Sequence, residues 1–446
     1  MHILIAGGGS SGFITAEYFM REGHDVTVIE RSPGIVRMLQ DRLDINVVQG
    51  LVTDVEILKT AGIAETKLFL AMTESDETNI IACGLAKQFE VPLKIARINQ
   101  RYFLTKETEH FLKILGVDEV VDGEQALVSE VEKLVQFPGA TDIKQFMDQE
   151  FTVGIFSFSR NSEFYGQPLK SIAMKCPVIP MGYSKVGRFQ PYDENVMINE
   201  FVYVYYACET KYLSELHKSL FPHVKPIKRA MISGGGYKSS ETNIGLATML
   251  KNQGVNDITL VVEGKEEAER INALGNFPVV MGDPSSPFFD KAENLTEQDL
   301  FVGLSNNFDK NLFACSVAYH HRVPYTISLV RYPEHANFIS TIPLTAFLNP
   351  ALIVANKIMK YHKLETIVSR VVLNYEQLEC IEFVIDAESK LMNKKIKELP
   401  LERSQVLAVR RGTHFMELSD EIRLQSKDRI LLMIVEQEKD VVKSLL

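Results

Sequence analysis

The chain carries one series of signals twice, first over residues 1 to about 221 and again from about 226 to 446. Each copy opens with an apolar, strand-like run and a glycine-rich turn, followed by a helix-like stretch. A second apolar run then ends in an acid, Glu30 in the first copy and Glu263 in the second. Strand, glycine turn, helix, strand and acid in this order are the fingerprint of a dinucleotide-binding fold. Later landmarks keep a nearly constant offset: Gly50 with Gly282, Asn79 with Asn311, and Cys83 with Cys315.

Each copy also divides into a large and a small part. Residues 1–137 alternate short apolar runs with helix-like stretches, the pattern of a parallel sheet covered on both faces. Residues 138–221, which begin at a Pro-Gly pair, are richer in strand-like segments. The same division gives a large part at 226–366 and a small part at 367–446. The sequence therefore predicts an α/β protein with two Rossmann-like parallel-sheet domains, each followed by a small α+β module.

The composition excludes several classes of protein. With 46% hydrophobic and 24% charged residues the chain is globular rather than disordered. A net charge of −10 disfavours a nucleic-acid partner. No apolar run approaches the roughly 20 residues of a spanning helix, and the N-terminus reads as a buried strand rather than a cleavable signal. The five cysteines show no CxxC pair, so we expect a cytoplasmic location.

The first glycine turn has the chemistry of a phosphate site. Gly7 permits a tight turn, Gly9 lets the backbone approach a pyrophosphate, and Gly12 lets the next helix pack close to the strand. The helix start at Ser10 and Ser11 offers free backbone N–H groups and the positive end of a dipole. These five residues are our first candidates for binding a cofactor. The alternative is that the glycines only form a tight turn.

Three further candidates of the first copy follow the carboxyl ends of strands. Glu30 is placed to accept hydrogen bonds from ribose hydroxyls, and its charge favours NAD(H) or ATP/ADP over NADP. Thr73 and Asp76 follow the fourth strand. Alternatively, Glu30 is a surface acid, and Asp76 or Ser75 caps the helix that begins there.

The whole series resembles the Trk-type potassium-uptake regulatory subunits (TrkA-like), whose tandem repeats are RCK (regulator of potassium conductance) domains. The duplication, the segment 73–79 and the strand 95–98 carry the resemblance most specifically. It implies a nucleotide-binding subunit on the inner face of the membrane that gates a Trk-type potassium channel or transporter partner. It also implies a homo-oligomer, a tetrameric ring, and an Arg97 that lies near nucleotide phosphates. For Arg97 a surface salt bridge is the alternative.

The two copies diverge at the candidate residues. In the second copy these are Gly234, Gly236, Lys238, Glu263 and Asp283. Ser239, Phe308 and Leu329 take the places of Gly12, Asp76 and Arg97. Asp283 stands where the first copy has Leu51, and Lys238 either offers a cation to phosphate or is merely solvated. We therefore expect unequal sites, of which the second binds more weakly or prefers another nucleotide.

Two amphipathic helices are expected where each large part passes into its small part. Over 123–137, Leu127, Val131, Leu134 and Val135 recur with helical spacing. The counterpart, at about 341–361, is apolar on two faces. We expect both helices to carry an interface between repeats or between subunits.

No catalytic constellation accompanies the glycine turns. Neither a GxSxG elbow nor an HExxH helix is present. The adjacent His320 and His321 have no third ligand nearby, which argues against a zinc site. The sequence therefore favours a regulatory ligand-binding subunit with no catalytic residue. The alternative is an NAD-dependent oxidoreductase with duplicated halves, which would turn over its cofactor.

Overall fold

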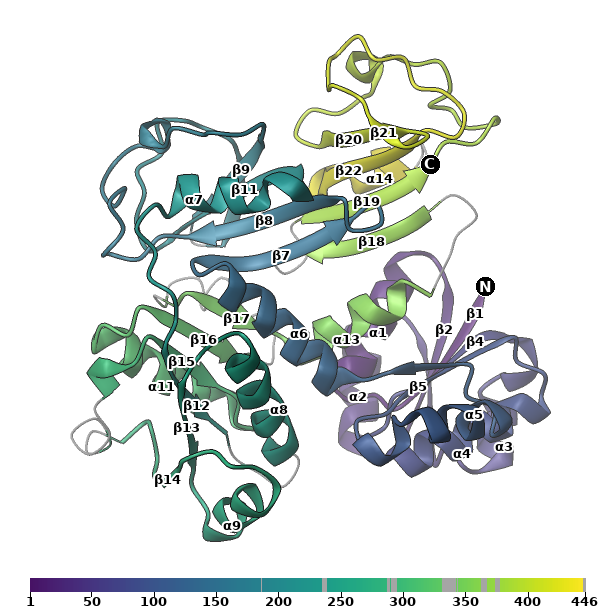
Figure 1. Cartoon of the computed structure of the whole chain (residues 1–446). Helices are drawn as coiled ribbons and strands as arrows, with labels where there is room; N and C mark the ends of the chain where they lie inside the picture. Colours follow the sequence, from purple (N-terminus) through teal and green to yellow (C-terminus); the bar gives the residue numbers. More distant parts are fainter. Residues whose placement is uncertain are drawn as a thin grey trace. The chain divides into compact units, whose positions relative to one another are not determined.

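The structure is a computed structural model of the 446-residue chain. The residues that it describes are all but 186, 235–238, 287–288, 290–294, 331–341, 343, 362–366, 374–377 and 444–446. They form two compact units, one of residues 1–127 and 349–361 and one of residues 128–348 and 362–446 (Figure 1).

The first unit contains a six-stranded parallel sheet in the order β3-β2-β1-β4-β5-β6. The order reverses between β1 and β4, which is where sheets of this type bind ligands at their carboxyl edge. The strands are β1 (His2–Ala6), β2 (Asp25–Glu30), β3 (Asn46–Gln49), β4 (Thr66–Ala71), β5 (Leu93–Arg97) and β6 (Glu119–Val121).

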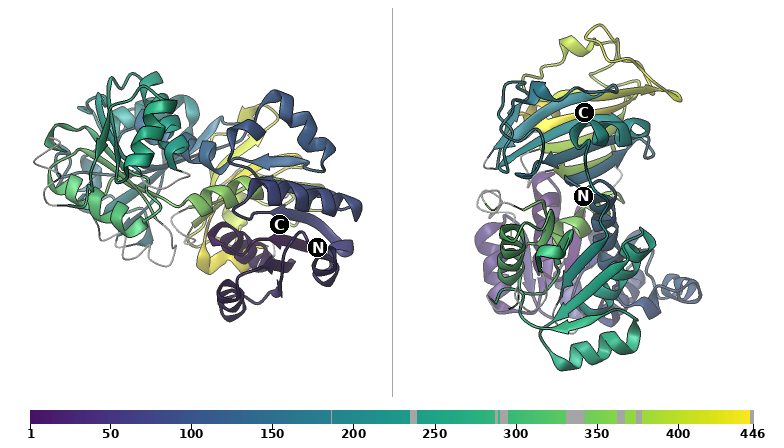
Figure 2. Two further views of the ribbon diagram at one scale, coloured as in Figure 1. Left: turned by 90° about the horizontal axis from the view of Figure 1, so that it is seen from below. Right: turned by 60° about the vertical axis from the view of Figure 1, so that its left-hand side comes forward.

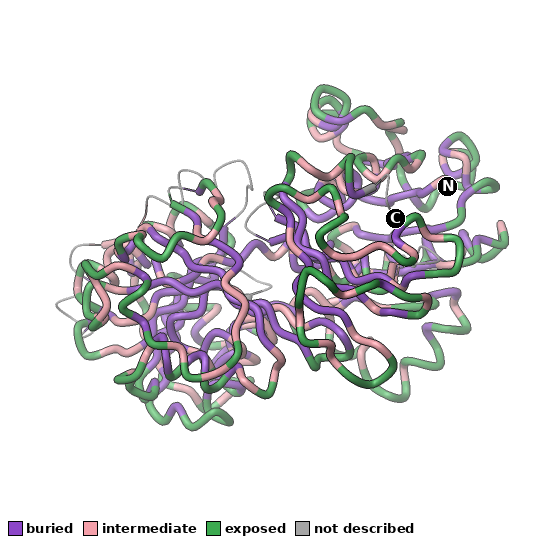
Figure 3. The backbone as a smooth tube through the Cα atoms, turned by 90° about the horizontal axis from the view of Figure 1, so that it is seen from above, coloured by how far each residue is buried: buried purple, intermediate pink, exposed green. Residues whose placement is uncertain are grey.

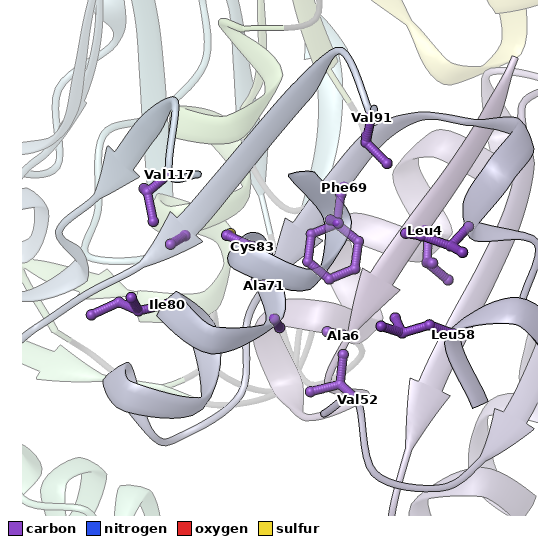
Figure 4. Close-up of a cluster of buried hydrophobic side chains, with 14 of the residues drawn as sticks. Leu4, Ala6, Val52, Leu58, Phe69, Ala71, Ile80, Cys83, Val91 and Val117 are labelled. Carbon is purple, nitrogen blue, oxygen red and sulfur yellow. The ribbon is translucent and has the colours of Figure 1, made fainter. Parts of the chain in front are cut away.

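Helices cover both faces of this sheet, because its strands are apolar on both sides. Alternate residues such as Leu4 and Ala6 face one side, which α3, α4 and α5 cover (Figure 4). Ile3 and Ile5 face the other side, which α1, α2 and α13 cover. The helices are α1 (Ser10–Arg21), α2 (Pro33–Arg42), α3 (Val55–Thr60), α4 (Asp76–Gln88), α5 (Lys106–Ile114) and α13 (Pro350–Met359). Helix α6 (Gly123–Gln136) follows β6 and belongs to the second unit from Val128 on.

Helix α13 belongs to the second copy in sequence but packs on the sheet of the first. Ala351, Ala355 and Met359 form a buried cluster with Ile14 of α1, and Val354 joins the core beneath it. The second predicted amphipathic helix thus does carry a contact between the two repeats.

The prediction of one helix over about 341–361 was wrong at its start. Residues Ala346–Leu348 form an edge strand, β17, and the helix begins only at Pro350. The Asn349 side-chain oxygen accepts hydrogen bonds from the N–H groups of Ala351 (2.9 Å) and Leu352 (3.2 Å). Because proline fits the first turn of a helix and disfavours helix before it, the Asn-Pro pair sets this boundary.

The second unit repeats the large sheet in the order β14-β13-β12-β15-β16-β17, again all parallel. Its strands are β12 (Arg229–Ser233), β13 (Asp257–Val262), β14 (Val279–Met281), β15 (Leu300–Gly303), β16 (Tyr325–Leu329) and β17. Its helices are α8 (Ser239–Asn252), α9 (Lys265–Leu274) and α11 (Phe308–His320). In Figure 3 the buried backbone lies mainly in the interior of each unit and the exposed backbone mainly at its outside.

Two small antiparallel sheets complete the second unit, and they pack against each other (Figure 2). Phe146, Tyr205, Leu373 and Met433 belong to their shared core. One module holds β7 (Ala140–Phe146), β8 (Phe151–Ser157), β9 (Ile179–Lys185), β10 (Arg188–Pro191), β11 (Val202–Glu209) and α7 (Leu213–Leu220). The other holds β18 (Ile367–Leu373), β19 (Leu378–Val384), β20 (Gln405–Arg411), β21 (His414–Phe415), β22 (Arg429–Val435) and α14 (Lys439–Lys443). The predicted α/β fold class is confirmed.

Candidate functional site

The first glycine turn joins β1 to α1 at the point where the strand order reverses. Gly7 has a φ of +101°, a conformation that side-chain-bearing residues rarely adopt, and its N–H donates to Ile29 O (2.9 Å). A Cβ on Gly12 would lie 1.9 Å from Gly7 O, so α1 packs directly on the turn. A Cβ on Gly9 would meet nothing within 4 Å. Gly9, the N-cap of α1, and Ser10 are exposed, whereas Ser11 is buried. The turn is therefore closed toward the sheet and open at the helix N-terminus.

Glu30 is the acid of this turn. Its Oε2 accepts a hydrogen bond from Gly8 N–H (2.7 Å) and its Oε1 accepts one from Ser32 N–H (2.8 Å). The side chain is 9% exposed, so Glu30 is not the surface acid of the alternative reading. Because a carboxylate oxygen accepts more than one hydrogen bond, Glu30 keeps capacity for a ribose hydroxyl.

Thr73 lies next to the turn, at the end of β4, and is held by Asn79. The Asn79 Oδ1 accepts from Thr73 N–H (2.9 Å) and Thr73 Oγ1 (2.7 Å). The Asn79 Nδ2 donates to Thr73 O (3.1 Å) and to Arg97 O (2.8 Å). This fully buried amide thus ties the ends of β4 and β5 together. It brings two of the predicted residues, Thr73 and Arg97, to one edge.

Asp76 and Arg97 complete that edge. The Asp76 Oδ2 accepts from the N–H groups of Asn99 (3.0 Å) and Gln100 (2.8 Å), while Ser75 caps α4. Asp76 therefore fixes the loop after β5 rather than capping its own helix. Burial lowers the pKa of Arg97 against the opposing charge of Asp76. Arg97 Nε has no hydrogen-bond partner among the described residues, so the alternative of a surface salt bridge at this atom is not observed.

The second copy repeats the asparagine contact. Asn311 Oδ1 accepts from Ser305 N–H (2.9 Å) and Ser305 Oγ (2.6 Å), and its Nδ2 donates to Ser305 O (2.8 Å). Leu329, at the place of Arg97, is buried. The contact of the asparagine with the residue after the fourth strand of the sheet is thus duplicated, while the arginine of the first copy is replaced by an apolar side chain.

The acids of the second copy have a different partner from that of Glu30. Lys310 Nζ lies 2.8 and 2.9 Å from the two carboxylate oxygens of Glu263 and 3.4 Å from Asp283 Oδ2. The hydrogen bond with Glu263 raises the pKa of Lys310. Hydrogen bonds from Ser285, together with Lys310, lower the pKa of Asp283. Glu263 and Asp283 are therefore brought together, but around a lysine of the protein itself.

The second glycine turn is longer than the first. His2 pairs with Asp25 and Arg229 with Asp257, so 28 rather than 23 positions separate the paired residues. Two of these five additional residues lie between β12 and α8, so Ser239 is the first residue of α8, as Ser10 is of α1, and does not take the place of Gly12. Gly236 and Lys238 lie outside the described residues. A Cβ on Gly234 would lie 1.8 Å from the side chain of Asn243. The start of this turn therefore packs against the Asn243 side chain, whereas Gly7 of the first copy packs against Gly12.

Sequence reasoning missed Lys310 and the structural role of Asn79. The constant offset that pairs Asn79 with Asn311 was the sequence signal for the structural role of Asn79. The same offset pairs Lys310 with Thr78, so the second copy has a positive charge where the first copy has an uncharged threonine.

The remainder of the described structure adds no metal site. No group of three or more His, Cys, Asp and Glu side chains within the described ranges is arranged to hold a metal ion. None of the described helices has the length and apolarity that crossing a membrane requires.

A separate cavity of about 490 Å³ in the second unit, lined in part by Phe158, Glu200 and Tyr319, includes none of the predicted site residues.

Two Rossmann-type sheets with glycine turns, alternating with two small α+β modules, define a tandem RCK-type protein. The TrkA-N domain model matches residues 3–122 and 239–350, and the TrkA-C domain model matches residues 380–445. These matches cover more than half of the chain, which therefore belongs to the family of Trk-type potassium-uptake regulatory subunits.

Curated relatives agree over the full length. The chain is 23% identical to the "Trk system potassium uptake protein TrkA" of Vibrio alginolyticus, over 98% of this chain and 96% of that protein. The protein of the same name from Azorhizobium caulinodans is 25% identical, over 100% of this chain and 98% of the relative. These names favour a regulatory subunit over the oxidoreductase alternative.

Solved structures show the same fold. The "GsuK RCK domain" covers 100% of this chain at a TM-score of 0.61 and 15% identity, with 94% of that chain aligned. The "GsuK channel bound to NAD" aligns at a TM-score of 0.60 and 15% identity, over 100% of this chain and 78% of that one.

Proposed function

We propose that this chain is a cytoplasmic regulatory subunit that binds an adenine nucleotide or NAD(H) in its first copy and thereby gates a Trk-type membrane potassium channel or transporter. The observation that carries the proposal is the first glycine turn. It is open at Gly9, backed by the N-terminus of α1, and flanked by the Glu30 carboxylate. Phosphate binding at such a helix terminus and ribose binding at such an acid follow from elementary electrostatics.

The first copy would hold the ligand in two places. The backbone N–H groups at the start of α1 face the pyrophosphate, and Glu30 faces a ribose. Across the reversal of the strand order, the edge tied by Asn79 carries Thr73 and Arg97. The positive charge of the Arg97 guanidinium favours a phosphate at that edge. Binding the phosphates and the ribose in this way requires no catalytic group.

Helix α1 is also the element that would pass the signal on. Its N-terminus is the proposed phosphate site, and its Ile14 packs against α13 of the second copy. A ligand that binds two arrangements of α1 with different affinity shifts the balance between them, and α13 responds because it shares a buried core with α1. Gating would follow from that shift in a homo-oligomeric, tetrameric ring.

Co-purification and flux measurements test this function. We expect the full chain to co-purify with a co-expressed Trk-type membrane subunit, and nucleotide to change potassium flux into vesicles that contain both. Glu30→Ala should shift the nucleotide effect to nucleotide concentrations about 10- to 150-fold higher while leaving co-purification intact. NADH absorbance should stay constant throughout. Steady consumption of NADH, or a flux indifferent to the chain, would overturn the proposal.

A further inference from the structure

Lys310 occupies a particular place in the second sheet. It is the third residue of α11, the helix that follows β15. Glu263 follows β13 and Asp283 follows β14, on the other side of β12 in the strand order β14-β13-β12-β15. The lysine side chain therefore passes over the carboxyl edge of β12, where the second glycine turn begins. This is the position at which a nucleotide ribose meets the acid in folds of this type.

The first copy has no such contact. Its α4 starts after the cap Ser75 and has Thr78 where α11, capped by Asn307, has Lys310. A threonine carries no charge and is too short to span the edge. Leu51 stands where Asp283 stands, and the Glu30 oxygens bind backbone N–H groups instead. The ion cluster of Glu263, Asp283 and Lys310 is thus specific to the second copy.

The ion cluster competes with a ligand without sealing the site. The side chains of Lys310, Asp283 and Glu263 are 38%, 39% and 48% exposed. Exposed ion pairs of this kind stabilise weakly, because water screens them. Lys310 nevertheless contacts both oxygens of Glu263, so a ribose hydroxyl that approaches Glu263 must compete with a charged ammonium group for the same oxygens, whereas at Glu30 it shares them only with neutral backbone N–H groups.

We propose that Lys310 is a specificity-determining residue that competes with the ribose of a nucleotide for Glu263, so that the second copy binds adenine nucleotides more weakly than the first. The inference rests on the proposed nucleotide-binding function. It assigns a physical cause to the inequality of the two copies: an ammonium group of the protein itself holds the ribose acid.

The test isolates the second copy in the full chain. In a Glu30→Ala background, calorimetric titration with ADP reports the second copy, and Lys310→Met is then added. Methionine keeps the length and apolar stem of the lysine without its charge. We expect ADP affinity to rise about fivefold, the worth of an exposed ion pair. The matched control is Lys113→Met, which removes an exposed lysine paired with Glu109 on α5 and should change nothing.

A reciprocal substitution keeps the proposal falsifiable if the background variant folds poorly. Thr78→Lys in the otherwise unchanged chain places an ammonium group near Glu30 and should weaken ADP binding at the first copy. Unchanged or weaker ADP binding on Lys310→Met would overturn the inference, because Lys310 would then be a bystander or a phosphate ligand. An unsubstituted chain that binds no ADP at either copy would instead refute the proposed function, and the inference with it.

Discussion

Gly9 and Gly12 lie close together at the first glycine turn, but alanine at Gly12 should lower stability, whereas alanine at Gly9 should weaken nucleotide binding. At Gly12 the new Cβ would lie 1.9 Å from Gly7 O, so the helix and the turn must separate by about 1 Å or more. Overpacking of this kind costs about 1–3 kcal/mol. For a unit of this size, each kcal/mol of lost stability lowers the unfolding temperature by about 2–4 °C.

At Gly9 the same methyl group meets no protein atom within 4 Å, and the φ of −63° suits alanine. Only the preference of the N-cap position opposes the change, at about 1 kcal/mol or less. The methyl group would, however, stand where a pyrophosphate approaches the backbone. We therefore expect Gly9→Ala to keep the unfolding temperature nearly unchanged and to lose at least tenfold in nucleotide affinity.

Thermal unfolding with and without ADP, together with calorimetry, separates these two effects. Gly12→Ala should lower the unfolding temperature of the free protein, whereas Gly9→Ala should remove the stabilisation that ADP confers. If Gly9→Ala binds ADP as tightly as the unsubstituted chain, the phosphate does not lie at this turn. The account of the first site would then fail.

Three further predictions concern the frame around the site. Asn79→Leu removes four hydrogen bonds of a buried amide and should destabilise the first unit by about 3–4 kcal/mol, measured by denaturant unfolding. Val354→Asp places a carboxylate in the core beneath α13, and should expose α1 to amide hydrogen exchange, whereas Val354→Ala should do so far less. Burial alone would raise the pKa of Glu130, but Lys144 and Lys133 hold it well below 4.5. Because the folded pKa is depressed, this stabilisation is present above about pH 4.5 and is lost as the pH falls toward the folded value, so acid should destabilise the chain more than its Glu130→Gln variant.

The duplication and the glycine turn made the fold predictable from sequence. Both features depend on local chemistry: a glycine at positive φ, a helix start and an acid at a strand end each have their own residue signature. The Asn349-Pro350 boundary also has a local residue signature, but the prediction did not use it. Apolar periodicity alone did not weigh the cap and the proline against the run of hydrophobic residues.

Side-chain partners were less predictable, because they join segments far apart in sequence. The contact of Asp76 with the backbone after β5 depends on how the ends of β4 and β5 are placed. The reach of Lys310 to Glu263 and Asp283 depends on three neighbouring loops at once. The packing of α13 on α1 depends on the chain returning to its first sheet after more than 300 residues. None of these follows from spacing alone.

If the first copy is the principal nucleotide site, calorimetric titration of two matched variants will separate it from the second copy. ADP, ATP, NAD and NADH are titrated into Glu30→Ala and Glu263→Ala in the full chain. Loss of charge-assisted hydrogen bonds at Glu30 should weaken the tighter event by about 1.5–3 kcal/mol, roughly 10- to 150-fold. The carboxylate of Glu263 is already bound by Lys310, so Glu263→Ala should leave that event essentially intact. Equal losses of the same ligand from both variants would show that the two copies are equivalent and would contradict the account.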